Sequence, residues 1–562
     1  MSIDAAQRDA ARPADVNENS GSSQGTTGNE AKGFLATLER VGNALPNPFW
    51  LFVILAGVVI ISSWIGSAAG MTAKDPATGD TIAVQNLATA EYFQKMVTDA
   101  VTNFTEFAPL GLILVCMLGV AIAEYSGLIG SAIRAAIAKV HSPMLLTFVV
   151  ALAGVTGSIA SDAVYVILIP LGAASFKAVG RNPIVGAMVA FAASSAGFNA
   201  SLVLNITDVL LAGISTTAAA FVDPEYVVSP LANYFFTMAS SIVLATIITV
   251  VTEFFITKHV VKTINDEHIN HEAAEFTKPG AKKAVAEADA KANAENHASG
   301  DSTDDREQLK LDSNERRGLA FAGIMAVIAL ASWTAFLVIP GSPLRGEGDG
   351  ILNSPLLTDI VVSIAIFFAA TGIAYGVGAK TIRSSSDIPD FMERGLDTLT
   401  AMMVLFFAVA QFTAYFKWSN LGQWTAIKGA EFLTTADLPP LVLFAALVLL
   451  VAVLNLLITS GSAQWALMAP VVVPMLMYVN VSPEVAQQLF RIGDSPTNII
   501  TPMSPYFALA LTFLQKYYKP AGVGTLMSLA LPYAISMLVG WFLFFVIWYL
   551  AGIPLGPGVP VR

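Results

Sequence analysis

The chain has 562 residues, of which 55% are hydrophobic and only 13% are charged, and its formal net charge at pH 7 is −11. Soluble domains carry about 25% charged residues, so this composition excludes an ordinary soluble protein and indicates an integral membrane protein. No dense basic run is present, which argues against a nucleic-acid partner. The single cysteine, Cys116, leaves no intrachain disulfide and no Cys-based metal site.

Two polar segments divide the chain. Residues 1–34, rich in Ser, Asn, Gln and Gly, predict a disordered cytoplasmic tail, and residues 259–317 mix Lys, Glu, Asp and Ala as in a solvated cytoplasmic linker. These two segments leave the apolar regions 35–258 and 318–562, which we interpret as two membrane repeats. Four of the five histidines fall in the linker, so histidine side chains for acid–base catalysis are not expected near the membrane core. We therefore expect a non-enzymatic protein without a cofactor.

Nine apolar stretches are long enough to cross a bilayer, which takes about 20 residues. They are residues 48–66, 107–126, 183–203, 237–257, 318–339, 357–378, 400–416, 485–514 and 523–551. Two more stretches, 142–176 and 441–479, are interrupted by small polar residues. Without its break, each arm of the first is about 20 Å long, too short to cross, so we predict a re-entrant hairpin. For the second, a pair of full crossings stays open.

The two interrupted stretches predict an internal duplication. Each is followed by a stretch that begins with proline, at Pro183 and Pro483, and that runs into a second irregular patch. Lipid cannot satisfy free backbone N–H and C=O groups, so broken backbone at membrane depth lines a polar cavity or is buried in protein. Most Lys and Arg residues fall on one side if the N-terminus is cytoplasmic, which gives the two hairpins opposite orientation. The predicted fold is an all-α, inverted-repeat membrane protein with a binding site at the repeat interface.

Arg491 and Asp494 are the strongest candidates for a functional role. They lie roughly 12 and 16 Å into the stretch that begins at Pro483, and three residues apart they share a helix face. Charges at that depth are costly unless they are paired or hydrated. Arg491 fits a substrate carboxylate, with Asp494 orienting it or binding an amine or cation. The alternative is a structural ion pair in a kinked helix.

The tips of the two hairpins supply further candidates. Asp162, with Ser161 and nearby carbonyls, is suited to a proton or a hard cation such as Na⁺, although Ser161 or Asp162 could simply cap a helix. Trp465 could offer a ring to an aryl substrate or pack at an interface. Neutral oxygen donors near the breaks are Asn199, Asn455 and Asn498. Asp208 is interpreted as a solvated residue near the outer surface.

Five segments resemble the AbgT family of p-aminobenzoyl-glutamate transporters. They read ERVGNALPNPFWLF (39–52), SDAVYVILIPL (161–171), NITDVLLAGIST (205–216), NLLITSGSAQWALMAPVVVPML (455–476) and RIGDSPTNIITPMSPYF (491–507). The resemblance runs from about residue 35 to 551 and leaves out the tail and the linker. By motif, it implies functional roles for Asp162, Asn455, Ser462, Trp465, Pro483, Arg491, Asp494 and Pro502.

The resemblance also implies a homodimer of nine spans and two opposed hairpins in the bacterial inner membrane. It implies cation-coupled transport of p-aminobenzoyl-glutamate, or export of sulfonamides and p-aminobenzoic acid. Neither the coupling ion, Na⁺ or H⁺, nor the direction follows from the sequence. The alternatives are a sodium-coupled di- or tricarboxylate carrier, an intramembrane hydrolase built on Asp162 and Asp494, and a channel. Trp465 beside Arg491 argues mildly against the carboxylate carrier.

Overall fold

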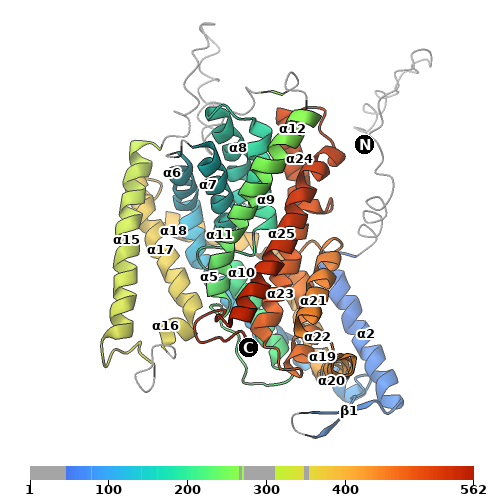
Figure 1. Ribbon diagram of the computed structural model, residues 1–562. Helices are drawn as coiled ribbons and strands as arrows, with labels where there is room; N and C mark the ends of the chain where they lie inside the picture. Colours follow the sequence, from blue (N-terminus) through green and yellow to red (C-terminus); the bar gives the residue numbers. More distant parts are fainter. Residues whose placement is uncertain are drawn as a thin grey trace, which may run out of the picture.

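The computed structural model describes residues 46–76, 79–138, 140, 142–160, 163–264, 269–270, 311–346 and 354–562. These residues are mostly helical (Figure 1). Within these described ranges, seven helices are long and apolar enough to cross a membrane. They are α2 (Pro48–Ala68), α5 (Ala108–Tyr125), α11 with its continuation (Tyr234–Lys262), α15 (Ser313–Val338), α17 (Ile360–Ala379), α19 (Thr400–Trp418) and α25 (Val523–Ala551).

Shorter apolar helices form the repeated core. In the first half these are α6 (Leu128–Ala138), α7 (Pro143–Thr156), α8 (Ala163–Ala178), α9 (Pro183–Ala196) and α10 (Ile206–Ala219). In the second half they are α21 (Pro440–Asn455), α22 (Gly461–Met477), α23 (Pro483–Thr497) and α24 (Pro505–Tyr517). The arms α7 and α8 have 14 and 16 residues, or about 21 and 24 Å. Both fall short of the bilayer's hydrocarbon core of about 30 Å.

Two of the nine predicted spans are broken helices rather than continuous ones. The stretch 183–203 is α9, which ends at Ala196, and 485–514 divides into α23, a 3₁₀ turn at Asn498–Ile500 and α24. The helix α10, which continues the chain beyond the first break, is not among the stretches predicted from the sequence. If α9 with α10 and α23 with α24 each cross once, these two pairs and the seven long helices restore the predicted number of crossings.

The two halves follow the same order of elements, as duplication predicts. A proline interrupts the second arm of each hairpin, at Pro170 in α8 and at Pro470 in α22. The next helix of each half begins with proline, Pro183 or Pro483, at a position where its missing N–H costs nothing. Both pairs of prolines are 300 residues apart. The backbone is thus interrupted at equivalent places in the two halves.

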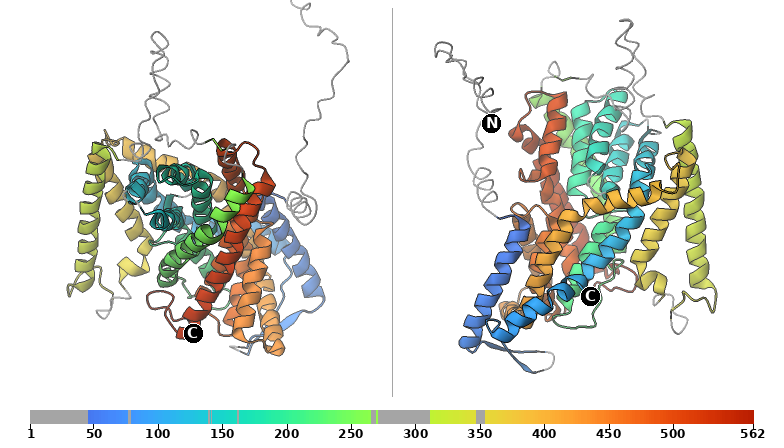
Figure 2. Two further views of the ribbon diagram at one scale, coloured as in Figure 1. Left: turned by 45° about the horizontal axis from the view of Figure 1, so that its top comes forward. Right: turned by 180° about the vertical axis from the view of Figure 1, so that it is seen from behind.

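The long helices α11 and α25 run across the middle of the molecule beside the short helices (Figures 1 and 2). α8 packs on α9, α7 packs on α9 and α11, and α21 packs on α23. α15 stands at the edge of the molecule against α17, and α2 stands at another edge against α19.

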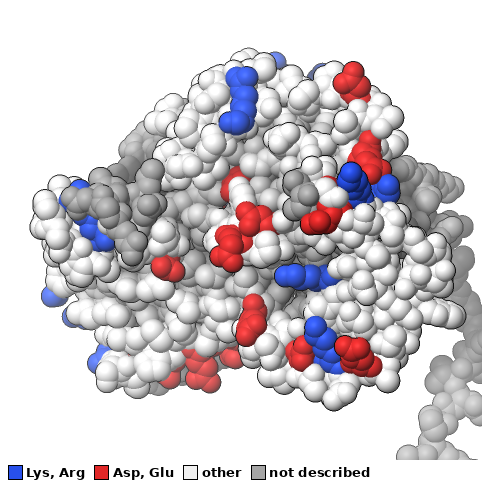
Figure 3. All heavy atoms as spheres, turned by 90° about the horizontal axis from the view of Figure 1, so that it is seen from below, with Lys and Arg blue, Asp and Glu red and all other residues white. Residues whose placement is uncertain are grey.

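The remaining elements are short or amphipathic. They are β1 (Thr72–Lys74), β2 (Thr81–Ala83), α3 (Ala90–Thr98), α4 (Ala100–Thr105), a 3₁₀ turn at Gly157–Ala160, a π-helical turn at Thr252–Ile256, α12 (Thr257–Thr263), α16 (Pro355–Thr358), α18 (Asp387–Thr398) and α20 (Leu421–Ala436). The strands pair antiparallel, with Ala73 opposite Ile82. Viewed from below, the charges lie in small separate groups of both signs, and no continuous basic surface covers the described residues of this face (Figure 3).

Candidate functional site

A cavity of about 400 Å³ lies where the two repeats meet. Its wall includes Ser158 beside the tip of hairpin 1 (α7–α8) and the tip of hairpin 2 (α21–α22), residues 459–462. The helix breaks after α9 and α23 complete it, together with residues from the junction of α18 and α19. Broken backbone therefore borders a cavity in this structure, as its presence at membrane depth requires.

Equivalent positions of the two repeats both contribute to the wall. Eleven residues after the initial proline of α9 and α23 stand Ser194 and Asp494, and both line the cavity. Two further pairs of equivalent residues also line the cavity. They are Phe198 with Asn498, at the two breaks, and Ile206 with Tyr506. The cavity is thus built around the pseudo-symmetric interface, and among its described lining residues the one carboxylate, Asp494, comes from the second repeat.

The buried cation of α23 is paired across the repeats. Arg491 Nη1 lies 2.7 Å from Asp208 Oδ1, and the two side chains are 1% and 6% exposed. The same nitrogen donates to the carbonyl of Asn199 at 3.3 Å. Asp208 is therefore not the solvated surface residue expected from its position in the sequence. Asp208 lies in the first turn of α10, directly after the break, and is buried there.

Asp208 is held in place by the N-terminus of its own helix. Asn205 caps α10: its side chain accepts from Asp208 N at 3.1 Å, and Asp208 Oδ2 accepts from Asn205 N at 2.9 Å. This reciprocal arrangement satisfies two backbone donors that a helix leaves unpaired. Asn205 Nδ2 also donates to Ser158 Oγ at 3.0 Å. The cap thereby connects the tip region of hairpin 1 to the Arg491–Asp208 pair.

Asp494 was expected to act with Arg491, three residues before it in α23, but its hydrogen-bond partner is Asn199. Its Oδ2 accepts a hydrogen bond from Asn199 Nδ2 at 2.8 Å, while Asp494 Oδ1 has no hydrogen-bond partner among the described residues. Asn199 N also donates to Ser495 Oγ at 3.1 Å. A Cβ built on Gly461 would lie 3.1 Å from Asp494 Oδ2, so only a glycine lets hairpin 2 approach this closely without displacement. Asp494 thus lies between the first break and the second hairpin.

Asn455 fastens the end of α21 to the broken part of α23. Its Nδ2 lies 2.6 Å from the carbonyl of Asp494, 2.8 Å from Thr497 Oγ1 and 3.1 Å from Asn498 Oδ1. The first contact satisfies a carbonyl near the helix end, where intrahelical partners run out. Asn455 Oδ1 has no partner among the described residues. Asn455 therefore has a structural role, and its Oδ1 could accept from or coordinate another ligand.

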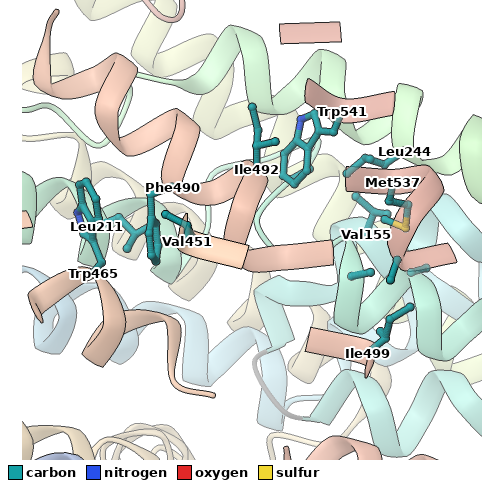
Figure 4. Packing of buried hydrophobic residues seen from close by; sticks show 14 of the residues in the cluster. Val155, Leu211, Leu244, Val451, Trp465, Phe490, Ile492, Ile499, Met537 and Trp541 are labelled. Carbon is teal, nitrogen blue, oxygen red and sulfur yellow. The ribbon is translucent and has the colours of Figure 1, made fainter. Parts of the chain in front are cut away.

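Trp465 supports the cavity from behind. It is fully buried, and its ring lies 4.7 Å from that of Phe490, whose side chain lines the cavity (Figure 4). Trp465 Nε1 donates to Ser215 Oγ at 3.0 Å, and Ser215 Oγ lies 3.0 Å from Gln487 Oε1. In this conformation Phe490, rather than Trp465, offers the aromatic surface to a ligand.

The other predicted site residues are distributed as follows. Ser462 and Asn498 line the cavity. Pro483 is the buried first residue of α23, and Pro502 lies in the break before α24. Asp162 and Ser161 lie outside the described residues, so their predicted role at the ion site stays a prediction.

Tyr165 and Tyr506 belong to the cavity although the sequence analysis did not select them. Their rings stack in parallel, with centroids 4.2 Å apart and an interplanar angle of 4°. Tyr165 Oη donates to the carbonyl of Ser194 at 3.1 Å, close to the first break. Both residues stand within the segments that resemble the family, and Tyr506 immediately follows the proline that starts α24. A search for aromatic residues next to the breaks would have found them.

Fold and site together define a multi-pass membrane transporter. The family model for the "AbgT putative transporter family" matches residues 33–294 and 290–562. The chain belongs to this family.

The chain is similar to several known members. It is 36% identical over 527 residues to the p-aminobenzoyl-glutamate transport protein of Escherichia coli (strain K12), covering 93% of this chain and 96% of the relative. The solved structure of the Alcanivorax borkumensis YdaH transporter has a TM-score of 0.79 and 36% identity, covering 91% of this chain and all of that one. Neisseria gonorrhoeae MtrF, described with a class of antimetabolite efflux pumps, has a TM-score of 0.81 and 39% identity, covering 94% of this chain and all of that one.

Proposed function

We propose that this transporter moves aryl compounds such as p-aminobenzoyl-glutamate or sulfonamides, coupled to Na⁺ or H⁺, through the cavity at the repeat interface. The observation that carries the proposal is the composition of the wall. Phe198, Phe490, Tyr165 and Tyr506 contribute rings, and hairpin-tip hydroxyls and Asp494 contribute polar atoms. A mainly apolar wall with a few placed polar groups is the usual form of a small-molecule site.

The charges around the cavity bear on the choice of substrate. Among its described lining residues Asp494 is the only one with a charged type of side chain, and no Lys or Arg reaches the wall. A di- or tricarboxylate would therefore meet no basic side chain among the described lining residues, which counts against the carboxylate carrier. For p-aminobenzoyl-glutamate, Arg491 would have to leave Asp208 to meet a carboxylate. An uncharged sulfonamide needs no such exchange, so this conformation suits it better.

The proposed coupling ion has suitable oxygen atoms near Asp494. Asp494 Oδ1, Asn199 Oδ1 and Asn455 Oδ1 are buried and have no hydrogen-bond partner among the described residues. Oxygen donors at interrupted helices are the groups that hold Na⁺ or a proton in transporters of this architecture. These residues would hold the ion, and its charge would offset that of the carboxylate. Asp162 remains a further proposed contributor.

Flux measurements on proteoliposomes test the function. Radiolabelled p-aminobenzoyl-glutamate and a radiolabelled sulfonamide would be followed in both directions, with Na⁺ and H⁺ gradients imposed separately. We expect gradient-driven flux that Asp494→Asn abolishes and that Asp223→Asn, an exposed loop variant, leaves unchanged. Flux that ignores both gradients would indicate a channel. Failure of both compounds to move through folded protein would overturn the substrate assignment, and cleavage of either compound would indicate a hydrolase.

The predicted assembly and orientation remain part of this proposal. We propose a homodimer in the bacterial inner membrane with a cytoplasmic N-terminus. Size-exclusion chromatography with light scattering would give the number of chains per particle. Labelling of an engineered cysteine in the N-terminal tail with an impermeant reagent, in intact and opened cells, would give the orientation. Tail labelling in intact cells would contradict the proposed orientation.

A further inference from the structure

A second cavity, of about 530 Å³, lies on the outer side of hairpin 1. It is bounded by α6 and α7 on one side and by α15 and α17 on the other, and it reaches Gly157 and Ile159 at the hairpin tip. The central cavity touches Ser158 between these two residues. The first arm of hairpin 1 therefore separates a central site from this outer crevice.

The crevice is almost wholly apolar. Thr156 and Thr371 are the only residues with polar side chains among those described in its lining. Thr371 Oγ1 is already engaged, since it donates to the carbonyl of Phe367 at 2.7 Å. Apolar cavities with so few polar partners do not hold ordered water well. Water is thus a poor occupant, and a hydrocarbon is the chemically matched one.

Small residues on α15 create the space. Ala322, Gly323 and Ala326 line the crevice, and a Cβ built on Gly323 meets no atom within 4 Å. The neighbouring stripe of α15 is exposed, with Ile324 at 60% and Val327 at 67%. In a membrane such a stripe faces lipid, and the crevice is continuous with it. Acyl chains are therefore the hydrocarbon available at its opening.

The end of the crevice at the start of α15 carries charge. Arg134 Nη2 of α6 pairs with Glu315 Oε1 of α15 at 2.5 Å and bridges the two helices there. Arg316 is exposed and precedes Leu319 and Gly323 by three and seven residues, so it shares the helix face that lines the crevice. Basic residues beside an apolar site attract the phosphate of anionic lipids.

We propose that this crevice binds one acyl chain of an anionic phospholipid, with the headgroup phosphate near Arg316. The chain would lie between α7 and the α15–α17 pair, where protein side chains leave room. One face of hairpin 1 would then rest on lipid instead of on interdigitated protein. Lipid binding in this crevice does not depend on which substrate the central cavity takes.

Photolabelling tests the site directly. Delipidated protein would be reconstituted with phosphatidylglycerol that carries a diazirine in one acyl chain, and the labelled peptides would be mapped by mass spectrometry. We expect labelling of α7 and of the Ala322–Ala326 part of α15. Ala326→Phe should reduce it roughly tenfold, the factor for losing contacts equal to about two buried methylene groups. Ala331→Phe, the same change on the exposed stripe, should leave it unchanged.

Several outcomes would overturn the proposal. Equal labelling of the two phenylalanine variants, or labelling spread evenly over α15, would show nonspecific contact with bulk lipid. If Ala326→Phe fails to fold, as judged by size-exclusion chromatography and melting, Gly323→Leu fills the same space and should lower labelling in the same way. Arg316→Gln should weaken labelling by phosphatidylglycerol but not by the phosphatidylcholine analogue. Equal loss with both probes would refute the headgroup assignment.

Discussion

Removing the charge of Asp208 should destabilise the protein strongly, because it leaves Arg491 buried without its partner. The two side chains are 6% and 1% exposed, and the joining distance is 2.7 Å. Breaking a buried ion pair by neutralising one member costs about 3–5 kcal/mol. Asp208→Asn retains an oxygen that can accept from Asn205 N, so the helix cap survives and the lost charge dominates. We expect a lower melting temperature and a smaller free energy of unfolding.

A double-mutant cycle separates the pair from its surroundings. Arg491→Gln should cost a similar amount, whereas Asp208→Asn with Arg491→Gln removes both charges and should cost much less than the sum. Asp223→Asn is the matched control, since Asp223 is exposed in a loop, and it should change stability by no more than about 0.5 kcal/mol. The assay is denaturant unfolding of purified protein in detergent. Additive effects, or Asp208→Asn as stable as the control, would refute the reasoning.

Substitutions at three further residues, Asn455, Gly493 and Trp465, test the packing around the cavity. Asn455→Ala removes the donor shared by three acceptors and should cost about 1–3 kcal/mol, with transport reduced; unchanged melting and flux would refute this role. Gly493→Ala places a Cβ 2.6 Å from the carbonyl oxygen of Val448 and should cost about 1–3 kcal/mol, whereas Gly524→Ala meets no atom within 4 Å and should not destabilise. Trp465→Phe should lose only the hydrogen bond to Ser215 and lower stability by about 0.5–1.5 kcal/mol. Trp465→Ala also removes the ring and should lower stability by about 3–5 kcal/mol. Equal melting temperatures for these two variants would contradict the supporting role of the ring.

The sequence predicts the architecture well because broken backbone in a membrane leaves clear local signals. Small polar residues interrupt apolar runs, and prolines fix where helices begin, as at Pro183 and Pro483. The predicted hairpins at 142–176 and 441–479 coincide closely with the helix pairs α7–α8 and α21–α22. The helix α10 was missed because its 14 residues are fewer than a span requires.

The partners within the site could not be read from the sequence. Arg491 is next to Asp494 along a helix, but its bonded carboxylate belongs to Asp208, 283 residues away in the other repeat. Local spacing says which side chains share a face, and only the packing of α10 against α23 says which of them meet. The same limit applies to Trp465: its hydrogen bond to Ser215 and its burial behind Phe490 depend on contacts between distant helices.

Photoaffinity mapping with an aryl azide sulfonamide would show where the substrate lies in the protein. We expect labelled peptides that contain Tyr165, Phe490 and Tyr506, competition by unlabelled sulfonamide, and loss of labelling in Phe490→Ala with the protein still folded. Labelling confined to other peptides, unaffected by Phe490→Ala, would contradict a binding site at the repeat interface.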